Sequence, residues 1–209
     1  PNMPKPTKPN AREPGGPPVL PGDYTVRLSN GKESVTQTVS VLTDPRVGIN
    51  KRNLEKLQPI YQRQMEITTS VTMAMDQIRE AKATIQSINK MLNPKGNKSH
   101  KELISRGKAI SDSLKLLEEL IVNKKGLQGI VRSPNILSSK VGAIGRYLYS
   151  NLSGPNDSHK YLLDYAEAET EKVLNQVNIF FKKDWDEYQS EVEDADLSFF
   201  KSYKPIKIN

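Results

Sequence analysis

The chain has 209 residues, a formal net charge of +7 and no cysteine, and only 6% of its residues are aromatic. The lack of cysteine excludes disulfides, thiolate metal ligands and a cysteine nucleophile, and no apolar run approaches the roughly 18 to 20 residues that cross a bilayer. The basic excess lies in residues 49–130, whereas residues 131–209 are acidic on balance. Antiparallel helices of opposite charge explain this pattern, so we expect no nucleic-acid partner.

Residues 1–47 predict a proline-rich segment followed by a β-hairpin. Asn30-Gly31 is the preferred two-residue turn, and it predicts that Leu28 faces Glu33. Strand alternation then places the apolar residues on one side of the hairpin, namely Leu20, Tyr24, Val26, Leu28, Val35, Val39 and Val41. A lone two-stranded ribbon is marginal in water, so this face needs further strands, the helices or a partner chain.

Residues 48–209 predict a mainly α fold of four amphipathic helices and a tail. The first helix covers residues 50–92, with a kink or a late start at Pro59. The second begins at a capping box formed by Ser99 and Glu102 and ends near residue 126, and the others cover residues 135–152 and 157–195. Short loops favour an up-down-up-down four-helix bundle. The last helix then returns beside the hairpin, and we expect the tail, residues 199–208, to dock there.

No motif predicts a reaction centre, so we expect no catalytic residue, no cofactor, no metal site and no enzymatic activity. His100 and His159 each stand in Ser-His-Lys at a predicted helix start, where capping explains them. The carboxylates of residues 167–171 and 184–194 are typical of a solvated helix face. An acid/base pair of carboxylates, as in glycoside hydrolysis, is the alternative.

Aromatic residues gather near the end of the fourth predicted helix. Phe180, Phe181, Trp185 and Tyr188 follow one another at spacings of 1, 4 and 3, which is typical of a bundle core. The alternative is a carbohydrate-stacking or partner surface. Trp185, Tyr188 and Phe181 are therefore the candidate interaction residues.

The hairpin also carries a resemblance to a known family. Residues 20–32 read Leu-Pro-Gly-Asp-Tyr-Thr-Val-Arg-Leu-Ser-Asn-Gly-Lys, and residues 36–46 read Thr-Gln-Thr-Val-Ser-Val-Leu-Thr-Asp-Pro-Arg. This segment resembles the C-terminal region of bacterial secreted propeller proteins with Asp-box repeats, the sortilin-like or sialidase-like glycoside hydrolases. The resemblance extends over residues 14–92 and includes Asp76-Gln-Ile-Arg79. It implies that the hairpin is the end of an Ig-like sandwich completed by upstream residues, and no catalytic residue is carried over by it.

The resemblance implies a secreted, periplasmic or envelope location in a bacterium. We expect a non-catalytic C-terminal structural or interaction module of a propeller glycoside hydrolase-like protein, with its own upstream propeller domain as partner. Pairing of sheet edges between copies, giving a homo-oligomer, is left open. A free-standing envelope adhesion or glycan-binding module is the alternative function, and the exposure of Trp185 discriminates between the two.

Overall fold

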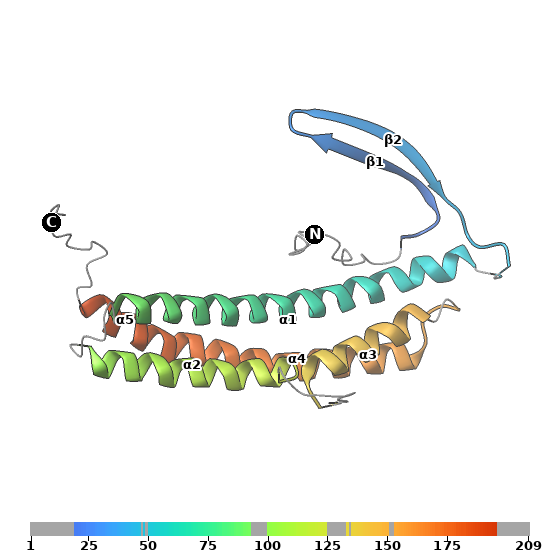
Figure 1. Cartoon of the computed structure of the whole chain (residues 1–209). Coiled ribbons are helices and arrows are strands. Elements are labelled where there is room, and N and C mark those ends of the chain that lie inside the picture. Colours follow the sequence, from blue (N-terminus) through green and yellow to red (C-terminus); the bar gives the residue numbers. More distant parts are fainter. Residues whose placement is uncertain are drawn as a thin grey trace. The chain divides into compact units, whose positions relative to one another are not determined.

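The computed structural model describes residues 19–46, 48, 50–92, 100–124, 133, 135–150 and 153–195. These residues form a small antiparallel sheet and several helices, which confirms the mainly helical class (Figure 1). The chain packs as two compact units, one of residues 1–68 and 142–166, the other of residues 69–141 and 167–209. The domain boundary expected between residues 47 and 48 stays a prediction.

Strands β1 (Gly22–Asn30) and β2 (Glu33–Val41) form the predicted hairpin. Its loop is Gly31-Lys32, one residue later than predicted, and Gly31 takes a φ of +60°, which glycine adopts without steric cost. Leu28 consequently lies opposite Val35 instead of Glu33, so the predicted register was wrong by two residues along β2. A shift of two preserves side-chain alternation, so the composition of each face is as predicted.

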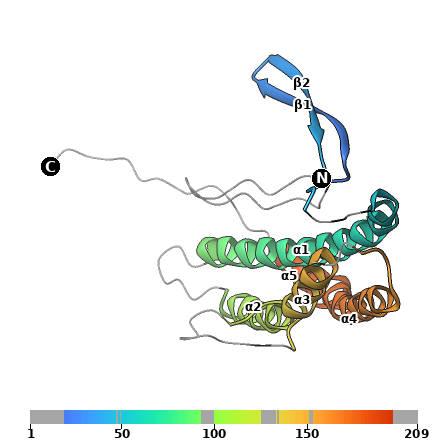
Figure 2. The same ribbon diagram turned by 90° about the vertical axis from the view of Figure 1, so that its right-hand side faces the viewer.

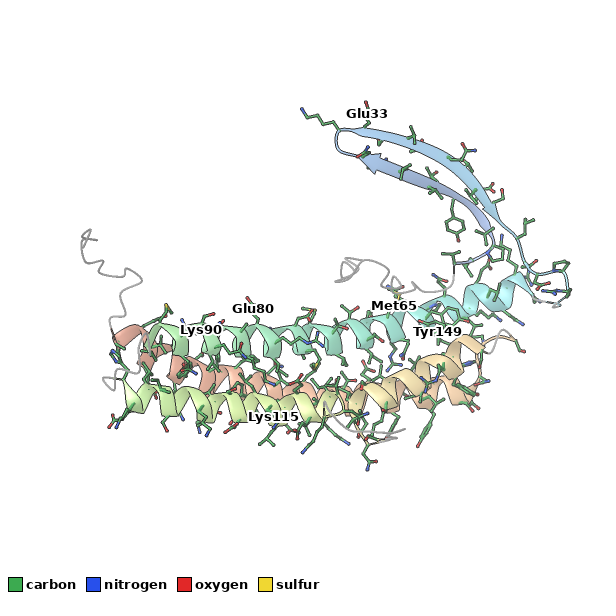
Figure 3. The ribbon with its side chains drawn as sticks, in the orientation of Figure 1. Glu33, Met65, Glu80, Lys90, Lys115 and Tyr149 are labelled. Atoms are coloured by element: carbon green, nitrogen blue, oxygen red, sulfur yellow. The ribbon has the colours of Figure 1, made fainter. Side chains whose placement is uncertain are left out.

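Helix α1 (Lys51–Leu92) is 42 residues long and runs through both units. Asn50 begins it by accepting a 2.9 Å hydrogen bond from the backbone N–H of Arg52 on its side-chain oxygen. Pro59 lies inside the helix without interrupting it. Outward-facing charged residues, for example Glu80, Lys90 and Lys115, are exposed (Figure 3).

Helices α2 (Lys101–Ile121), α3 (Leu137–Ser150) and α4 (Asp157–Phe180) follow along the chain. A π-helical turn, η1 (Phe181–Trp185), joins α4 to α5 (Asp186–Asp194). The helical core is aliphatic for the most part. Its largest fully buried apolar side chains are Leu57, Ile78, Ile85, Leu92, Leu114, Ile121, Leu148, Leu163, Val177 and Tyr188.

Each unit has its own helix directions, which side-chain contacts establish. In the second unit, Lys82 of α1 pairs with Glu118 of α2, and Asn89 lies beside Gly107, so α2 is antiparallel to α1 (Figure 1 and Figure 2). In the first unit, the ring of Tyr61 lies 5.0 Å from that of Tyr149, and Gln64 contacts Gly145. Since α1 numbers rise as α3 numbers fall, α3 is also antiparallel to α1.

This direction of α3 differs from the up-down-up-down order that we predicted, in which the third helix is parallel to the first. The prediction assumed that each loop reverses the chain. The connection between Ile121 and Leu137 is longer than the roughly two to eight residues typical of reversing helix connections. The end of the last helix differs as well, because Tyr188 of α5 contacts Gly107 beside Asn89, near the end of α1 and not its start. The tail expected to dock at the hairpin lies outside the described residues.

Candidate functional site

The hairpin presents one apolar and one polar face. The apolar face is exposed, and the exposed fractions of its residues Tyr24, Val26, Leu28, Val35 and Val39 run from 36% to 71%. The opposite face consists of Asp23, Thr25, Arg27, Ser29, Ser34, Thr36, Thr38 and Ser40. Within the described part of the chain the sheet has only these two strands, so both are edges with unpaired backbone N–H and C=O groups.

Local hydrogen bonds hold the open end of the hairpin, opposite its loop. The hydroxyl of Tyr24 donates to the carbonyl of Leu20 at 2.7 Å, and the hydroxyl of Ser40 donates to the Asp23 carboxylate at 2.5 Å. After β2, a carboxylate oxygen of Asp44 accepts the backbone N–H of Arg46 at 2.9 Å, and the carboxylate also binds the guanidinium. Arg46 thereby lowers the pKa of the Asp44 carboxyl. The Asp-Pro-Arg motif is therefore a self-paired turn.

The three candidate interaction residues of the fourth predicted helix form one row of rings. Phe181 lies 5.9 Å from Trp185, and Trp185 lies 6.0 Å from Tyr188, measured between ring centroids. Tyr188 is only 1% exposed, whereas Phe181 and Trp185 are half-buried. Burial, with a smaller contribution from the charge of Glu191, raises the pKa of the Tyr188 hydroxyl. Tyr188 thus belongs to the core, and the ring of Trp185 packs against it.

The π-helical turn explains how Tyr188 reaches the core. Phe180 and Tyr188 are both buried but lie eight residues apart. In a regular α-helix a spacing of eight puts the second residue about 80° out of line, whereas a spacing of seven leaves it within about 20°. A π-turn absorbs one extra residue, so η1 returns Tyr188 to the side of the helix that Phe180 occupies. The sequence gives no period from which this turn could be predicted.

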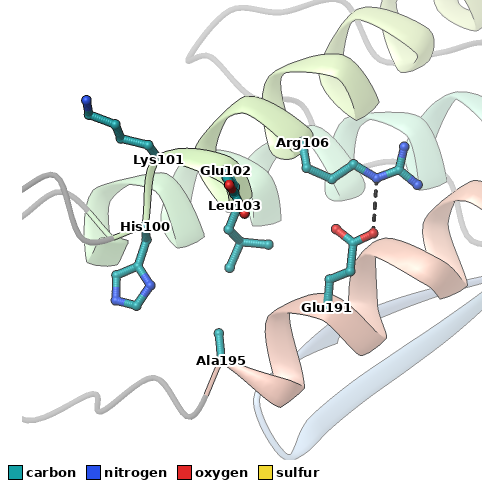
Figure 4. Close-up of a pocket in the computed structure, with 7 residues that line it drawn as sticks. All are labelled: His100, Lys101, Glu102, Leu103, Arg106, Glu191 and Ala195. Atoms are coloured by element: carbon teal, nitrogen blue, oxygen red, sulfur yellow. Dashed lines mark ion pairs between the residues drawn. The ribbon is translucent and has the colours of Figure 1, made fainter.

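A shallow pocket of about 680 Å³ lies where α2 begins and α5 ends (Figure 4). It is lined by His100, Lys101, Glu102, Leu103, Arg106, Glu191 and Ala195. The guanidinium of Arg106 is paired with Glu191 at 3.3 Å and with Glu187 at 3.2 Å. The lining therefore mixes both signs of charge, and its central cation is already neutralised by carboxylates of the same unit. This arrangement does not define a substrate.

The carboxylate of Glu169 on α4 is held by two lysines. Glu169 binds Lys140 and Lys172, each at 2.5 Å, and these two cations lower its pKa to about 2. A carboxyl held ionised in this way is a poor proton donor near neutral pH. Among the residues that the structure describes, no three histidine or acidic side chains gather as metal ligands would.

The two histidines differ in their surroundings. His100 is the N-cap residue of α2 and makes no side-chain capping hydrogen bond. The predicted capping box includes Ser99, which lies outside the described residues. His159 is fully buried at the start of α4 and forms a reciprocal pair of hydrogen bonds with Asn156. The sequence did contain this signal, because Asn156 precedes His159 by three residues, the capping-box spacing. We had instead assigned the cap to the Ser-His-Lys triplet.

Comparisons with known proteins found no relative. No family model matches the chain, and neither a curated protein nor a solved structure is significantly similar to it. In the part of the chain that the structure describes, every helix is too short or too polar to cross a membrane. The exposed apolar face of the hairpin is therefore the feature on which a functional proposal rests.

Proposed function

We propose that this chain is a non-catalytic structural or interaction module of a secreted propeller glycoside hydrolase-like protein, and that its hairpin is the attachment. The observation that supports this proposal is the apolar face of Tyr24, Val26, Leu28, Val35 and Val39, which no described residue covers. A ribbon of two strands is marginal in water without a partner on that face. The partner would be the upstream propeller region of the same protein, through an Ig-like sandwich that the hairpin completes.

The two faces of the hairpin make the attachment testable. Burial of a valine or leucine side chain contributes about 1.5 to 3 kcal/mol, so a lysine on the apolar face should weaken attachment by about tenfold or more. The experiment produces the region encoded upstream of Pro1 separately and measures its affinity for the chain by calorimetry. Val26→Lys and Leu28→Lys are the test variants. Thr25→Lys and Thr36→Lys add the same charge to the polar face and should bind as the unaltered chain does.

Three results would count against the proposal. A gene without propeller repeats upstream would remove the proposed partner. Equal losses of affinity on the two faces would show that the apolar face is not the attachment. Turnover of any chromogenic glycoside by the chain alone would show that it carries catalysis itself.

Trp185 bears on the glycan-binding alternative. It is half-buried against Phe181 and Tyr188, whereas a stacking platform for a sugar needs an open ring face. The hairpin therefore has the stronger support as the working surface.

A further inference from the structure

We propose that the start of α4 is an acid-sensitive latch: neutral His159 closes a capping box with Asn156, and protonation of His159 Nδ1 in mild acid opens the first turn of the helix. This inference concerns the first unit only and is independent of the proposed function.

The latch consists of two hydrogen bonds of equal length. Nδ1 of His159 accepts the backbone N–H of Asn156 at 3.0 Å, and the side-chain oxygen of Asn156 accepts the backbone N–H of His159 at 3.0 Å. This is the geometry of a capping box, in which glutamate or glutamine usually stands where His159 stands here. Because Nδ1 accepts, the proton of the neutral ring is on Nε2, and Nε2 is buried with no hydrogen-bond partner.

The turn before α4 is held against α1 by Asn53. The side-chain amide of Asn53 donates to the carbonyl of Ser153 at 2.7 Å. Gly154 has a φ of +111°, and a Cβ at this position would lie 3.1 Å from Asn53. The capping box therefore closes a turn that only glycine fits, and its loss would release residues 153–156 as well as the helix start.

Within the part of the chain that the structure describes, no carboxylate pairs with His159 to compensate an imidazolium. From α3 the titratable neighbour is Tyr147, whose ring lies 5.6 Å away. On α4 itself Asp157 and Lys160 are exposed. The charged residues of the first two turns of α1, Lys51, Arg52, Glu55 and Lys56, are exposed too.

Protonation acts against the latch in three ways. Nδ1 takes a proton from water and becomes a donor, so the N–H of Asn156 loses its acceptor. A cation then lies in a fully buried site, where both ring N–H groups need acceptors. The positive end of the helix dipole also disfavours a cation at the N-terminus.

The direction of the pH effect follows from linkage. Burial lowers the pKa of His159 below its ordinary value of 6.5. Below pH 6.5 the open state therefore binds more protons than the closed state, and the closed state loses stability as the pH falls toward the lowered pKa. The contribution is complete above pH 6.5. For the uptake of one proton, the opening equilibrium rises by at most about tenfold per pH unit.

Hydrogen exchange of the full chain tests the latch. Exchange is followed by mass spectrometry at pH 7.5 and pH 5.0, corrected for the intrinsic pH dependence of amide exchange, and residues 153–166 are compared with residues 101–121. The unaltered chain should lose protection in residues 153–166 at pH 5.0, by up to about tenfold per pH unit below 6.5. His159→Gln should not, because its amide oxygen accepts the N–H of Asn156 without titrating. His159→Glu should lose protection only near the ordinary glutamate pKa of about 4.3.

The only other histidine provides the matched control. His100→Gln should behave as the unaltered chain does, since His100 takes no part in the latch. Should a His159 variant fail to fold, the imidazole resonances of the unaltered chain supply the answer, and the His159 midpoint should lie below the ordinary histidine value of about 6.5. Three results would overturn the proposal: unchanged protection of residues 153–166 between the two pH values, an acid loss that His159→Gln retains, or a His159 midpoint at or above 6.5.

Discussion

The hydroxyl of Tyr188 lies 2.8 Å from the position that a Cβ on Gly107 would occupy. Gly107 is therefore the socket on α2 into which the ring of α5 inserts. This close approach sets the distance between α2 and α5. The contact could not be inferred from hydrophobic spacing alone, because Gly107 contributes no apolar side chain.

Substitution of the socket should be costly. In Gly107→Ala the new methyl group would lie 2.8 Å from the Tyr188 hydroxyl and 3.3 Å from the side-chain oxygen of Asn89. Overpacking of this kind lowers the free energy of unfolding by about 1 to 3 kcal/mol, which urea denaturation measures. Gly142→Ala is the control, since a Cβ there meets only Arg146 at 3.6 Å. Adding Tyr188→Phe to Gly107→Ala should recover part of the loss, and strict additivity of the two would contradict the socket.

Deletion of one residue from the π-turn should be tolerated. Removing Lys183 reduces the spacing from Phe180 to Tyr188 from eight positions to seven, so a regular α-helix would keep both on the same side. Removing the exposed Glu171 from α4 instead rotates everything that follows by about 100°. Thermal unfolding should show a small change for the first deletion and a severe loss for the second. Equal losses would mean that the turn is not a one-residue insertion.

The ion pairs of Glu169 should appear in the acid limb of the stability curve. Lys140 and Lys172 lower the pKa of Glu169 from 4.5 to about 2, so their contribution is present above pH 4.5 and is lost as the pH falls toward 2. Glu169→Gln should therefore be less stable than the unaltered chain at pH 6, and the two urea midpoints should converge near pH 2. The exposed Glu171→Gln is the control and should change neither midpoint. A constant difference between the chain and Glu169→Gln at all pH values would contradict the pairing.

Local sequence patterns predicted the strands and helices well and predicted their arrangement poorly. Alternation identified both faces of the hairpin although the loop begins at Gly31, because a shift of two residues keeps each side chain on its face. The helix predicted over residues 50–92 is α1, Lys51–Leu92, since its apolar positions recur with the helical period throughout. The predicted direction of α3 was wrong because that direction depends on the connection between Ile121 and Leu137, and hydrophobic periodicity does not encode the course of a connection.

The burial of Tyr188 could not be predicted from the sequence for a related reason. Spacing places Tyr188 in a core or on a surface equally well until the phase of its helix is known, and that phase depends on η1. The capping box of Asn156 and His159 was not predicted, because histidine is unusual at the third helical position of such a box. The partner of the apolar face of the hairpin stays a prediction.

The division of the molecule has a genetic consequence. Each unit is assembled from two stretches of sequence, residues 1–68 with 142–166 and residues 69–141 with 167–209. A single crossover within the coding region can therefore transfer neither unit to another protein without part of the other. A crossover between residues 69 and 166 would disrupt both units together, whereas the hairpin, encoded by one uninterrupted stretch, remains free to be exchanged.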